Sequence, residues 1–467
     1  MSARFLLPIA GSAIVLVLTG CAQSSKYPIT DSYGPQPHLP EPKSSLLPTV
    51  NIAPAKGWPT DTMPTPAKGL KVQAFAKELQ HPRWLYVLPN GDVLVAETDA
   101  PPKPDDSKGI KGKIMKLVMK RAGSSHPSAN RIHLLRDSNG DGVADQKTVL
   151  IENLNSPFGM VLVGNMLYVA NTDSLMRFPY QEGTTQITQS GSKVLDLPGG
   201  KLNHHWTKNV ISNPAGTKLY ITVGSNSNVA ENGLDKETGR AQIMEFDIAS
   251  GKARSFATGL RNPNGMAWQP QSGVLWTVVN ERDEIGNDLV PDYLTSVKDG
   301  AFYGWPYSYY GQHVDTRVKP QKPELVARAV KPDYALGNHT ASLGLTFYTA
   351  KLMPQYYGGA LIGQHGSWNR KPHSGYKVIF VPFQNGQPSG QPQDLLTGFL
   401  SDQGEALGRP VGVAVDSSGA VLVADDVGNT IWRISPVDAT PDKRPMYESV
   451  NPNSASQQPV SSEPSVK

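Results

Sequence analysis

Six segments of this chain share one pattern, and that repeat constrains the fold more than any other feature. Each segment has a proline or polar opening, an apolar strand that alternates at period two, a turn with Gly or Asn, and a second strand. The segments begin at His81, Ser156, His205, Arg261, Ala341 and Arg409. Their spacing of roughly 50–80 residues fits one four-stranded blade with its loops. The pattern predicts an all-β, six-bladed β-propeller, because a pair of β-sandwiches would not repeat one opening six times.

The openings of the repeats are where a ligand site is expected. In a propeller, the inner strands and the loops before them surround a central channel, so residues at the same phase of several blades face one axis. His205, Arg261 and Arg409 stand at such openings, and Asn262 follows Arg261. Closed, rigid strands hold these residues at fixed separations, which catalysis requires. A base, a guanidinium and an amide at one axis suit oxidation of a polar substrate by a bound cofactor better than they suit a scaffold.

The first 21 residues predict a lipoprotein signal. Arg4 precedes an apolar run at residues 5–18, and small residues lead to Cys21, the single cysteine of the chain. The run contains Pro8 and is shorter than the about 20 apolar residues of a spanning helix. The string Leu-Thr-Gly-Cys resembles a bacterial lipobox, which implies cleavage after residue 20 and acylation of Cys21. No Asp follows Cys21, and by the same resemblance this favours the periplasmic face of the outer membrane. The alternatives are a plain secretory signal or a core cysteine.

Composition divides the chain after the signal (residues 1–20) into three parts. Residues 21–66 are rich in Pro, Ser and Thr with little apolar periodicity, which predicts a lipidated tether. Residues 67–435 hold the six repeats and are the predicted propeller domain. Residues 436–467 are again polar and rich in Pro and Ser, which predicts a disordered tail. A chain with one cysteine forms no disulfide within itself, so its stability must come from core packing, with or without a metal.

The charge balance excludes one class of partner. The formal net charge is +4, and the sequence contains neither a run of Lys and Arg nor a nucleic-acid-binding motif. Proteins that bind nucleic acid carry a clustered basic patch or stripe. Nucleic acid is therefore not expected as a partner.

Six strings in order along the chain resemble one known family. They are HHWTKN, GLRNPNGMAW, NERDEIGND, FYGWPYSYYG, GQHGSWNR and GRPVGVAVD. Together they resemble the glucose/sorbosone dehydrogenases, which are soluble aldose dehydrogenases that depend on pyrroloquinoline quinone (PQQ) and fold as six-bladed propellers. The resemblance covers about residues 67–435. It implies oxidation of an aldose sugar or a sorbosone-like aldehyde. Because the chain has no Cys-x-x-Cys-His haem motif, electrons would leave to a separate periplasmic carrier.

The chemistry of PQQ explains the residue types in these strings. Its three carboxylates favour Arg or Lys, its quinone oxygen favours a nearby cation, and the sugar hydroxyl requires a general base. By resemblance, His205 is the base, Arg261 lies beside the quinone oxygen and Asn262 hydrogen-bonds the cofactor. The alternatives are a histidine that bonds a neighbouring loop and an arginine that satisfies loop carbonyls.

The chain departs from the family at two positions. Arg409 resembles a carboxylate-binding arginine, but Leu407 stands where the glucose enzymes have a second arginine. Arg370 and Lys371 are the candidates for the missing positive charge, unless this stretch is a solvated hairpin turn. His204 replaces an acidic residue of the glucose enzymes, so substrate or cofactor contacts are expected to differ there.

Two acidic stretches are candidate calcium sites. By resemblance, the loop at residues 280–288 holds calcium at the cofactor through backbone carbonyls near Asp283 and Glu284; the alternative is an acidic surface loop. A second stretch has the oxygen spacing of a short calcium loop, with Asp137, Asn139, Asp141 and Asp145. It lacks the twelfth-position Glu of an EF-hand. A structural calcium loop and a tight hairpin remain equal alternatives for it, away from the active site.

Two other classes of function remain open. A calcium-dependent propeller lactonase or hydrolase would need carboxylates at the axis, whereas this chain offers His and Arg there. A catalytically inactive binding propeller is the second alternative, because of the departures at His204 and Leu407. The sequence leaves the sugar, the electron acceptor and the oligomeric state undetermined, since rim loops decide specificity.

Overall fold

The computed structural model describes residues 24–43, 49–102, 121, 123 and 127–439, and nearly all of its regular structure is β-sheet. One α-helix is described over its full length, α2 (Pro323–Ala327), together with three 3-10 helices, η1 (Ile29–Ser32), η2 (Leu234–Glu237) and η3 (Pro354–Tyr356). No helix within these ranges is long and apolar enough to cross a membrane.

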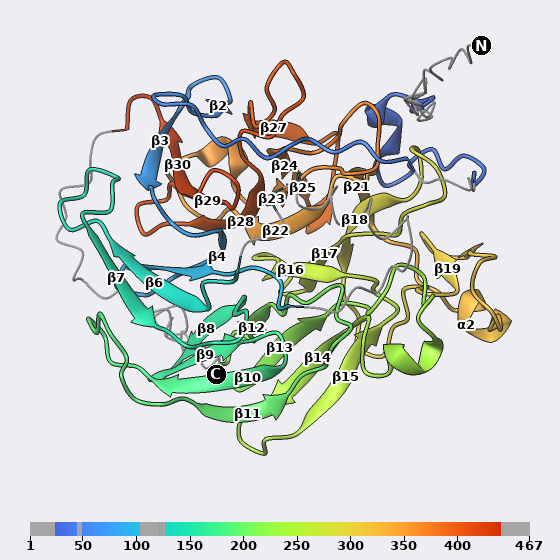
Figure 1. The fold of residues 1–467 in the computed structure, drawn as a ribbon, viewed down its shortest axis with the longest axis horizontal. Helices are drawn as coiled ribbons and strands as arrows, with labels where there is room; N and C mark the ends of the chain where they lie inside the picture. The colour runs from blue at the N-terminus through green and yellow to red at the C-terminus, as the bar shows by residue number, and fades with distance from the viewer. Residues whose placement is uncertain (1–23, 44–48, 103–120, 122, 124–126, 440–467) are drawn as a thin grey trace, which may run out of the picture.

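Six four-stranded units form the blades, and Figure 1 shows that they follow one another around the molecule in sequence order. The strands are given from the innermost outward. The first blade has β4 (Pro82–Val87), β5 (Val93–Glu97), β6 (Arg131–Arg136) and β7 (Gln146–Ile151), and the second has β8 (Met160–Val163), β9 (Met166–Ala170), β10 (Ser174–Pro179) and β11 (Ser192–Asp196). The third blade has β12 (Val210–Ser212), β13 (Lys218–Val223), β14 (Gln242–Asp247) and β15 (Ala253–Thr258), and the fourth has β16 (Pro263–Trp268), β17 (Leu275–Val279), β18 (Pro291–Ser296) and β21 (Tyr334–Asn338). The fifth blade has β22 (Ser342–Phe347), β23 (Ala360–Gln364), β24 (Lys377–Val381) and β27 (Gln393–Thr397), and the sixth has β28 (Pro410–Val415), β29 (Val421–Asp425), β30 (Thr430–Pro436) and β3 (Leu70–Ala76). Two short hairpins stand outside the blades, β19 (Ser308–Tyr309) with β20 (His313–Val314) and β25 (Phe383–Gln384) with β26 (Gln387–Pro388). Each predicted opening lies just before an innermost strand, so the six-bladed propeller is confirmed.

The ring closes because the last blade takes its outer strand from the start of the propeller. β3 pairs antiparallel with β30, and Ala74 lies opposite Trp432. The innermost strands of consecutive blades contact one another all the way round, including β28 with β4. Because the ring closes, the first and last blades pack against each other and neither is left as an open end of the row.

Glycines in the innermost strands explain why the repeat carries Gly soon after its opening. A Cβ on Gly344 would stand 2.1 Å from the carbonyl oxygen of Val411, and one on Gly265 would stand 2.5 Å from the backbone nitrogen of Leu345. Neighbouring blades therefore approach too closely at the axis for any side chain at these positions.

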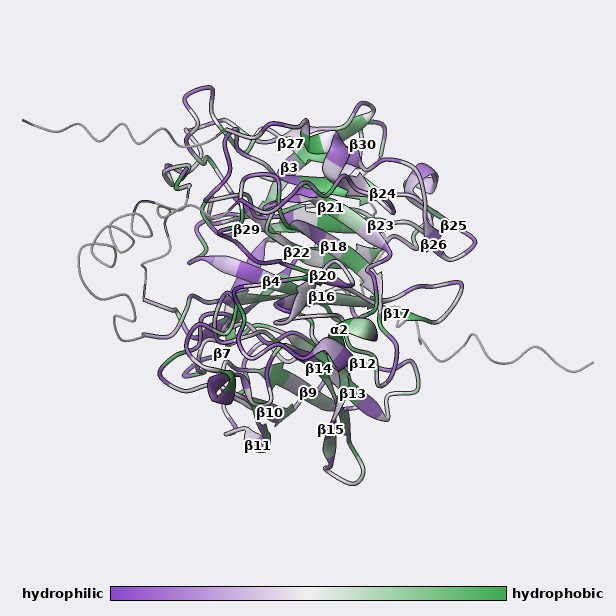
Figure 2. Ribbon diagram, turned by 90° about the vertical axis from the view of Figure 1, so that its right-hand side faces the viewer, coloured by the Kyte–Doolittle hydropathy of each residue, from purple (hydrophilic) through white to green (hydrophobic). Residues whose placement is uncertain are grey.

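The core lies between the blades. The second strands β5, β17, β23 and β29 are buried along their whole length. Figure 2 shows hydrophobic residues along the strands and hydrophilic residues along many of the connecting loops. Apolar faces of adjacent sheets thus pack on one another, and polar positions are left to the rims, as expected of sheets packed face to face.

The N-terminal segment differs from the predicted tether, since residues 24–43 and 49–66 lie against the propeller. β1 (Tyr33–Gly34) extends the fourth blade by pairing with β21, and β2 (Thr65–Pro66) extends the fifth by pairing with β27. Isolated bridges join Asn51 to Asn369 and Ala55 to Ala406. In Figure 1 this segment is the blue ribbon that runs along the orange blades. The physical reason is that exposed blade edges offer unpaired N–H and C=O groups, which bind extended chain without any apolar periodicity.

Three sequence predictions fall wholly or largely outside the described residues. The signal at residues 1–20 and the lipidation of Cys21 lie in the first 23 residues, which are not described. Most of the tail predicted for residues 436–467 lies beyond residue 439.

Candidate functional site

Residues from three blades meet around Asp426, which follows β29. Its Oδ2 accepts a 2.9 Å hydrogen bond from Arg83 and a 2.8 Å bond from Nε2 of His365. The His81 ring stands 3.8 Å from the same oxygen, and Arg409 donates to the His365 carbonyl at 3.5 Å. Residues far apart in the sequence are thus joined at one end of the channel. We call these five residues the Asp426 cluster.

The protonation of the Asp426 cluster follows from its burial and charges. Burial works to raise the pKa of Asp426, but the charges around it, including the permanent one of Arg83, hold that pKa well below its usual value. Burial lowers the pKa of His365 to about 4 despite the neighbouring carboxylate. His365 is therefore neutral at pH 7. Its Nε2–H donates a hydrogen bond to Asp426, and its lone pair is on Nδ1.

His205 and Asn262 come together around Gly224, at the end of β13. A Cβ on Gly224 would stand 2.4 Å from Cβ of His205 and 2.6 Å from Oδ1 of Asn262. Nδ1 of His205 lies 2.9 Å from the carbonyl oxygen of Ser225, to which it must donate. This bond places the lone pair of the neutral ring on Nε2, the form that a general base requires. The fold thus places His205 and Asn262 near one another, and their catalytic roles stay predictions.

Arg261 is buried and its donors are used within the protein. Nε donates to the carbonyl of Asn228, and one terminal nitrogen donates to the carbonyls of Asn280 and Glu281. The other terminal nitrogen donates to the Asn228 side chain and stands 3.5 Å from Oδ2 of Asp283. This is the loop-satisfying arrangement that the sequence left open as the alternative. A role beside the quinone oxygen stays a prediction.

Asp283 accepts hydrogen bonds from several neighbours. Its Oδ1 accepts bonds from Asn369 at 2.7 Å and from Nδ1 of His339 at 3.1 Å. Its backbone carbonyl accepts from Asn228 and Arg317. Burial would raise the pKa of Asp283, but the bond from His339 and the charge of Arg261 outweigh it and lower that pKa.

The side chains of the predicted calcium loop offer few open oxygens. The oxygens of Asp283 already accept hydrogen bonds, and Glu284 is exposed. Across the described ranges, no group of three or more His, Cys, Asp or Glu residues could hold a metal ion. Calcium prefers six to eight oxygen ligands, and a site built from the backbone carbonyls near Asp283 and Glu284 stays a prediction.

Arg409 and Arg370, two further predicted site residues, are buried arginines, and each has one N–H group without a partner among the described residues. The guanidinium of Arg409 packs 4.9 Å from the ring centre of Tyr376 and donates to the carbonyl of Ala53 at 3.1 Å. Arg370 donates to Ser25 and to the carbonyl of Pro372. The Nε atoms of both arginines, and that of Arg83, have no hydrogen-bond partner among the described residues.

Lys371 differs from these arginines. Its side chain is exposed, and only its backbone N–H is held, by Oδ1 of Asn287. A flexible exposed lysine contributes little positional precision to carboxylate binding. Of the two candidates for the missing charge, Arg370 is the buried one.

The stretch from Asp137 to Asp145 is a tight loop between β6 and β7. Asp137 accepts bonds from the backbone N–H groups of Gly140 and Gly142, Asn139 accepts from the N–H of Asp141, and Asp145 accepts from the N–H of Ser138. Backbone donors thus occupy the side-chain oxygens. Gln73 of the outer strand β3 donates to the same loop, which places it at the blade periphery. Of the two readings that the sequence left open, the tight hairpin accounts for these bonds.

The donor set fits an anion with several carboxylates. Arg370 and Arg409 are buried and Arg83 is partly buried, and the Nε of each has no partner in the described part of the chain. Oδ1 of Asn262 is likewise a buried acceptor without a partner there. Buried polar groups are normally paired, so such atoms mark a place for a ligand. PQQ carries three carboxylates, and Arg83, Arg370 and Arg409 are the residues that would hold them.

Sequence reasoning missed Arg83, His365 and Asp426. A signal for all three was present in the repeat. Arg83 lies in the opening of the first copy, while His365 and Asp426 each come directly after the second strand of their copies. Comparing equal phases across all six copies, and not only at the openings, would have found them.

The fold and these polar residues are compatible with a cofactor-dependent enzyme. Residues 125–297 and 313–436, more than half of the chain, match the model of the TrAA12-like family. The chain belongs to the TrAA12-like family, and the predicted resemblance to PQQ-dependent sugar dehydrogenases is confirmed at that level.

Curated relatives and a solved structure agree with this assignment. The chain is 25% identical over 359 residues to a pyrroloquinoline quinone-dependent pyranose dehydrogenase of Coprinopsis cinerea, an alignment that covers 64% of this chain and 48% of that protein. It is 27% identical over 201 residues to aldose sugar dehydrogenase YliI of Escherichia coli, covering 39% and 52%. The chain thus spans about half the length of these two relatives. The holo PQQ domain of the Coprinopsis cinerea pyranose dehydrogenase shares the fold, with a TM-score of 0.63 at 21% identity, covering 82% of this chain and 100% of that one.

Proposed function

We propose that this protein is a PQQ-dependent sugar dehydrogenase. It oxidises a CH–OH carbon of an aldose, or of a related sorbosone-like aldehyde, and passes the electrons to a separate carrier. The proposal is supported by the family, by the names of the relatives and by the arginine donors that fit three carboxylates. The observation that carries it is the meeting of His205 and Asn262 around Gly224, with Nδ1 of His205 fixed 2.9 Å from the carbonyl oxygen of Ser225.

The protein residues supply binding and proton transfer. When bound, PQQ supplies an ortho-quinone that accepts hydride from the sugar carbon. Arg409, Arg370 and Arg83 would hold its carboxylates through Nε–H groups that have no partner among the described residues. His205 takes the proton of the substrate hydroxyl at Nε2, and the carbonyl of Ser225 stabilises the imidazolium through Nδ1–H. Asn262 would hydrogen-bond the cofactor and so keep it in place beside His205.

Reconstitution with the cofactor tests this function. The soluble body starting after Cys21 is incubated with PQQ and calcium, singly and together, and dye reduction is measured with a panel of aldoses. Turnover that requires PQQ, with a red-shifted cofactor band, supports a quinoprotein. Hydrolysis of lactones without PQQ would replace the proposal with a lactonase. Neither activity, without cofactor binding, would indicate a binding propeller.

The PQQ-only arm decides the calcium question separately. The oxygens of Asp283 are occupied, so we expect PQQ alone to support binding and turnover. Turnover only with calcium present would restore the calcium prediction and require the 280–288 loop to rearrange.

We also propose that Cys21 anchors the enzyme at the periplasmic face of the outer membrane. The support is the lipobox-like string at residues 18–21 and the absence of Asp after it. Labelled palmitate should enter the full chain and not a Cys21→Ala variant, and the wild type should fractionate with outer membranes. Equal labelling of both would refute the anchor.

A further inference from the structure

Lys208 is a fully buried lysine that bonds a neutral acceptor. It lies in the loop that opens the third blade, and its exposed fraction is 0%. Among the described residues its Nζ has one hydrogen-bond acceptor, the backbone carbonyl of Trp206 at 3.1 Å. A lysine carries three donors, and a buried lysine is normally paired with an acidic group. One neutral partner for a buried ammonium therefore needs a physical explanation.

This arrangement costs free energy of folding. Burial and the like charge of Arg240 lower the pKa of Lys208 to about 7, although the charge of Asp173 acts in the opposite direction. Water solvates an ammonium group better than a single carbonyl does. A methionine of similar volume would fill the same space without this cost. The lysine therefore does not serve stability, and its use must lie in what its hydrogen bond holds.

The Trp206 carbonyl is the point where two blades are joined. Oγ1 of Thr172, which lies just after β9 in the second blade, donates to the same oxygen at 3.0 Å. Thr172 is itself fixed, because its Oγ1 accepts a 2.9 Å bond from Asn203, which in turn accepts a 2.8 Å bond from Arg240. The innermost strands of the two blades, β8 and β12, lie side by side (Figure 1). Donors from two blades thus hold one backbone oxygen.

Trp206 joins the proposed base to the first two blades. It follows His205 directly, and its indole packs edge-on against Phe158, with ring centres 6.1 Å apart. The guanidinium carbon of Arg83 lies 5.7 Å from the centre of the same indole, a cation–π contact. A movement of the Trp206 backbone would therefore move His205 relative to both of these neighbours.

We propose that Lys208 is a positioning residue for His205. Together with Thr172 it fixes the carbonyl of Trp206 and so holds the backbone of the base, while the carbonyl of Ser225 holds the ring at 2.9 Å. The inference rests on the proposed role of His205 and adds a residue to the same site. Such rigid support matters, because displacement of a reacting group by about 1 Å can lower turnover by about 10²-fold.

Lys208→Met tests the inference in cofactor-free protein. The variant keeps the volume, and the Trp206 carbonyl keeps its bond from Thr172, so Tm should equal or exceed that of the wild type. The imidazole nitrogens of 15N-histidine-labelled protein are recorded by NMR, and the His205 signals are assigned by their loss in His205→Ala. In the wild type we expect a single tautomer with the proton on Nδ1. In Lys208→Met we expect a mixture of tautomers, because the ring no longer keeps its place against Ser225.

Thr172→Val repeats the test from the other donor, and Thr172→Ser, which keeps the hydroxyl, should restore the wild-type signals. Thr277→Val is the matched control. Thr277 is 0% exposed and donates to the carbonyl of Gly265 at 2.9 Å, against 3% and 3.0 Å for Thr172 and its carbonyl. We expect Thr277→Val to lose a similar amount of stability while the His205 signals stay unchanged.

Turnover gives a second measurement. With PQQ bound, kcat for an aldose should fall about 10–10²-fold in Lys208→Met and Thr172→Val, with KM changed by less than about twofold. Unchanged His205 signals in both variants would overturn the inference and leave Lys208 a structural lysine. Because the NMR sample contains no cofactor, its result decides the role of Lys208 even if the wild type oxidises no aldose, an outcome that would refute only the proposed function.

Discussion

His365 and Asp426 belong to neighbouring blades, and a 2.8 Å hydrogen bond from Nε2 to Oδ2 joins them at the mouth of the channel. The bond fixes a neutral imidazole in a buried place between Arg83 and Arg409. Its consequence is a dependence of stability on acid.

Acidification should destabilise the protein through His365. Burial lowers the pKa of His365 to about 4, below the about 6.5 of the unfolded chain. The stabilising contribution is therefore complete above pH 6.5 and is lost as the pH falls toward 4. The free energy of unfolding in urea, measured from pH 7.5 to 4, should fall less steeply in His365→Gln than in the wild type. Parallel curves would contradict this assignment.

Alkaline pH should act on a different histidine. Both ring nitrogens of His339 face acceptors, Asp283 Oδ1 at 3.1 Å and the carbonyl of Gly286 at 2.9 Å. Burial would lower the pKa of His339, but the bond to Asp283 and its charge outweigh it and raise that pKa. This contribution is present below the unfolded pKa and is lost as the pH rises through the folded one. Urea unfolding between pH 6 and 9 should show the loss in the wild type and not in His339→Gln.

Removal of the proposed base should abolish chemistry and spare binding. His205→Ala should lower turnover by about 10²–10⁴-fold, the usual contribution of general-base catalysis, while PQQ still binds. Dye-linked turnover and absorbance titration of the cofactor measure the two effects. His313→Ala, at an exposed position on β20, is the control. Unchanged turnover in His205→Ala would remove this residue from the mechanism.

Gly224→Ala should disturb the same site by crowding. Its Cβ would stand 2.4 Å from His205 and 2.6 Å from Asn262, so both side chains must move. We expect turnover to fall by about 10²-fold and stability by about 1–3 kcal/mol, as in other overpacked sites. Gly164→Ala has open space and a positive φ, so it should cost about 1 kcal/mol through strain alone. Equal activity of both variants would show that the contact at Gly224 is tolerated.

Arg409→Ala should weaken retention of the cofactor. The variant loses a buried guanidinium whose Nε is unpaired in the described residues, and we expect Kd for PQQ to rise at least about tenfold. Equilibrium dialysis followed by absorbance measures it. Arg254→Ala is the control, because that arginine pairs with Asp299 at the surface. An unchanged Kd would assign Arg409 to holding Ala53 and Tyr376 only.

The repeat pattern predicted the architecture because blades are local structures. Period-two alternation, a turn and a closely placed Gly are all readable within about 20 residues, and six copies dictate six blades. The same logic brought His205 and Asn262 to one site. The same reasoning did not predict the place of the N-terminal segment. That segment is held by backbone hydrogen bonds to distant blade edges and has no apolar pattern of its own.

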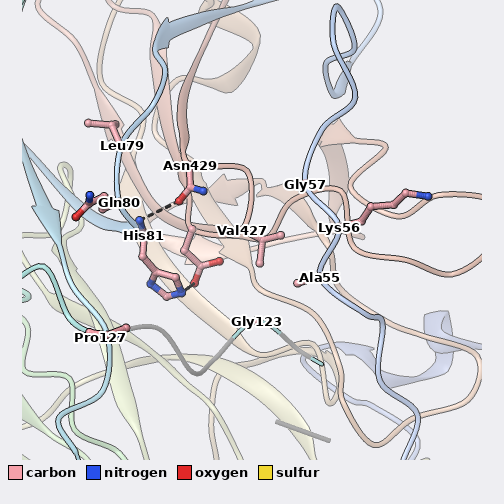
Figure 3. A pocket seen from close by; sticks show the side chains of 11 residues that line it. Ala55, Lys56, Gly57, Leu79, Gln80, His81, Gly123, Pro127, Val427 and Asn429 are labelled. Atoms are coloured by element: carbon pink, nitrogen blue, oxygen red, sulfur yellow. Dashed lines mark hydrogen bonds and ion pairs between the residues drawn. The ribbon is translucent and has the colours of Figure 1, made fainter. Parts of the chain in front are cut away.

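The sequence by itself determined the propeller, the family and the residue types at its axis. Only the tertiary structure decided which arginines are free to bind. The donors of Arg261 bond Asn228, Asn280 and Glu281, whereas Nε of Arg409 has no partner within the described ranges. It also decided that residues 55–57 line a cavity (Figure 3). The physical reason is that strand patterns record local burial, whereas the partners of a buried polar atom are set by segments that meet only when the ring closes.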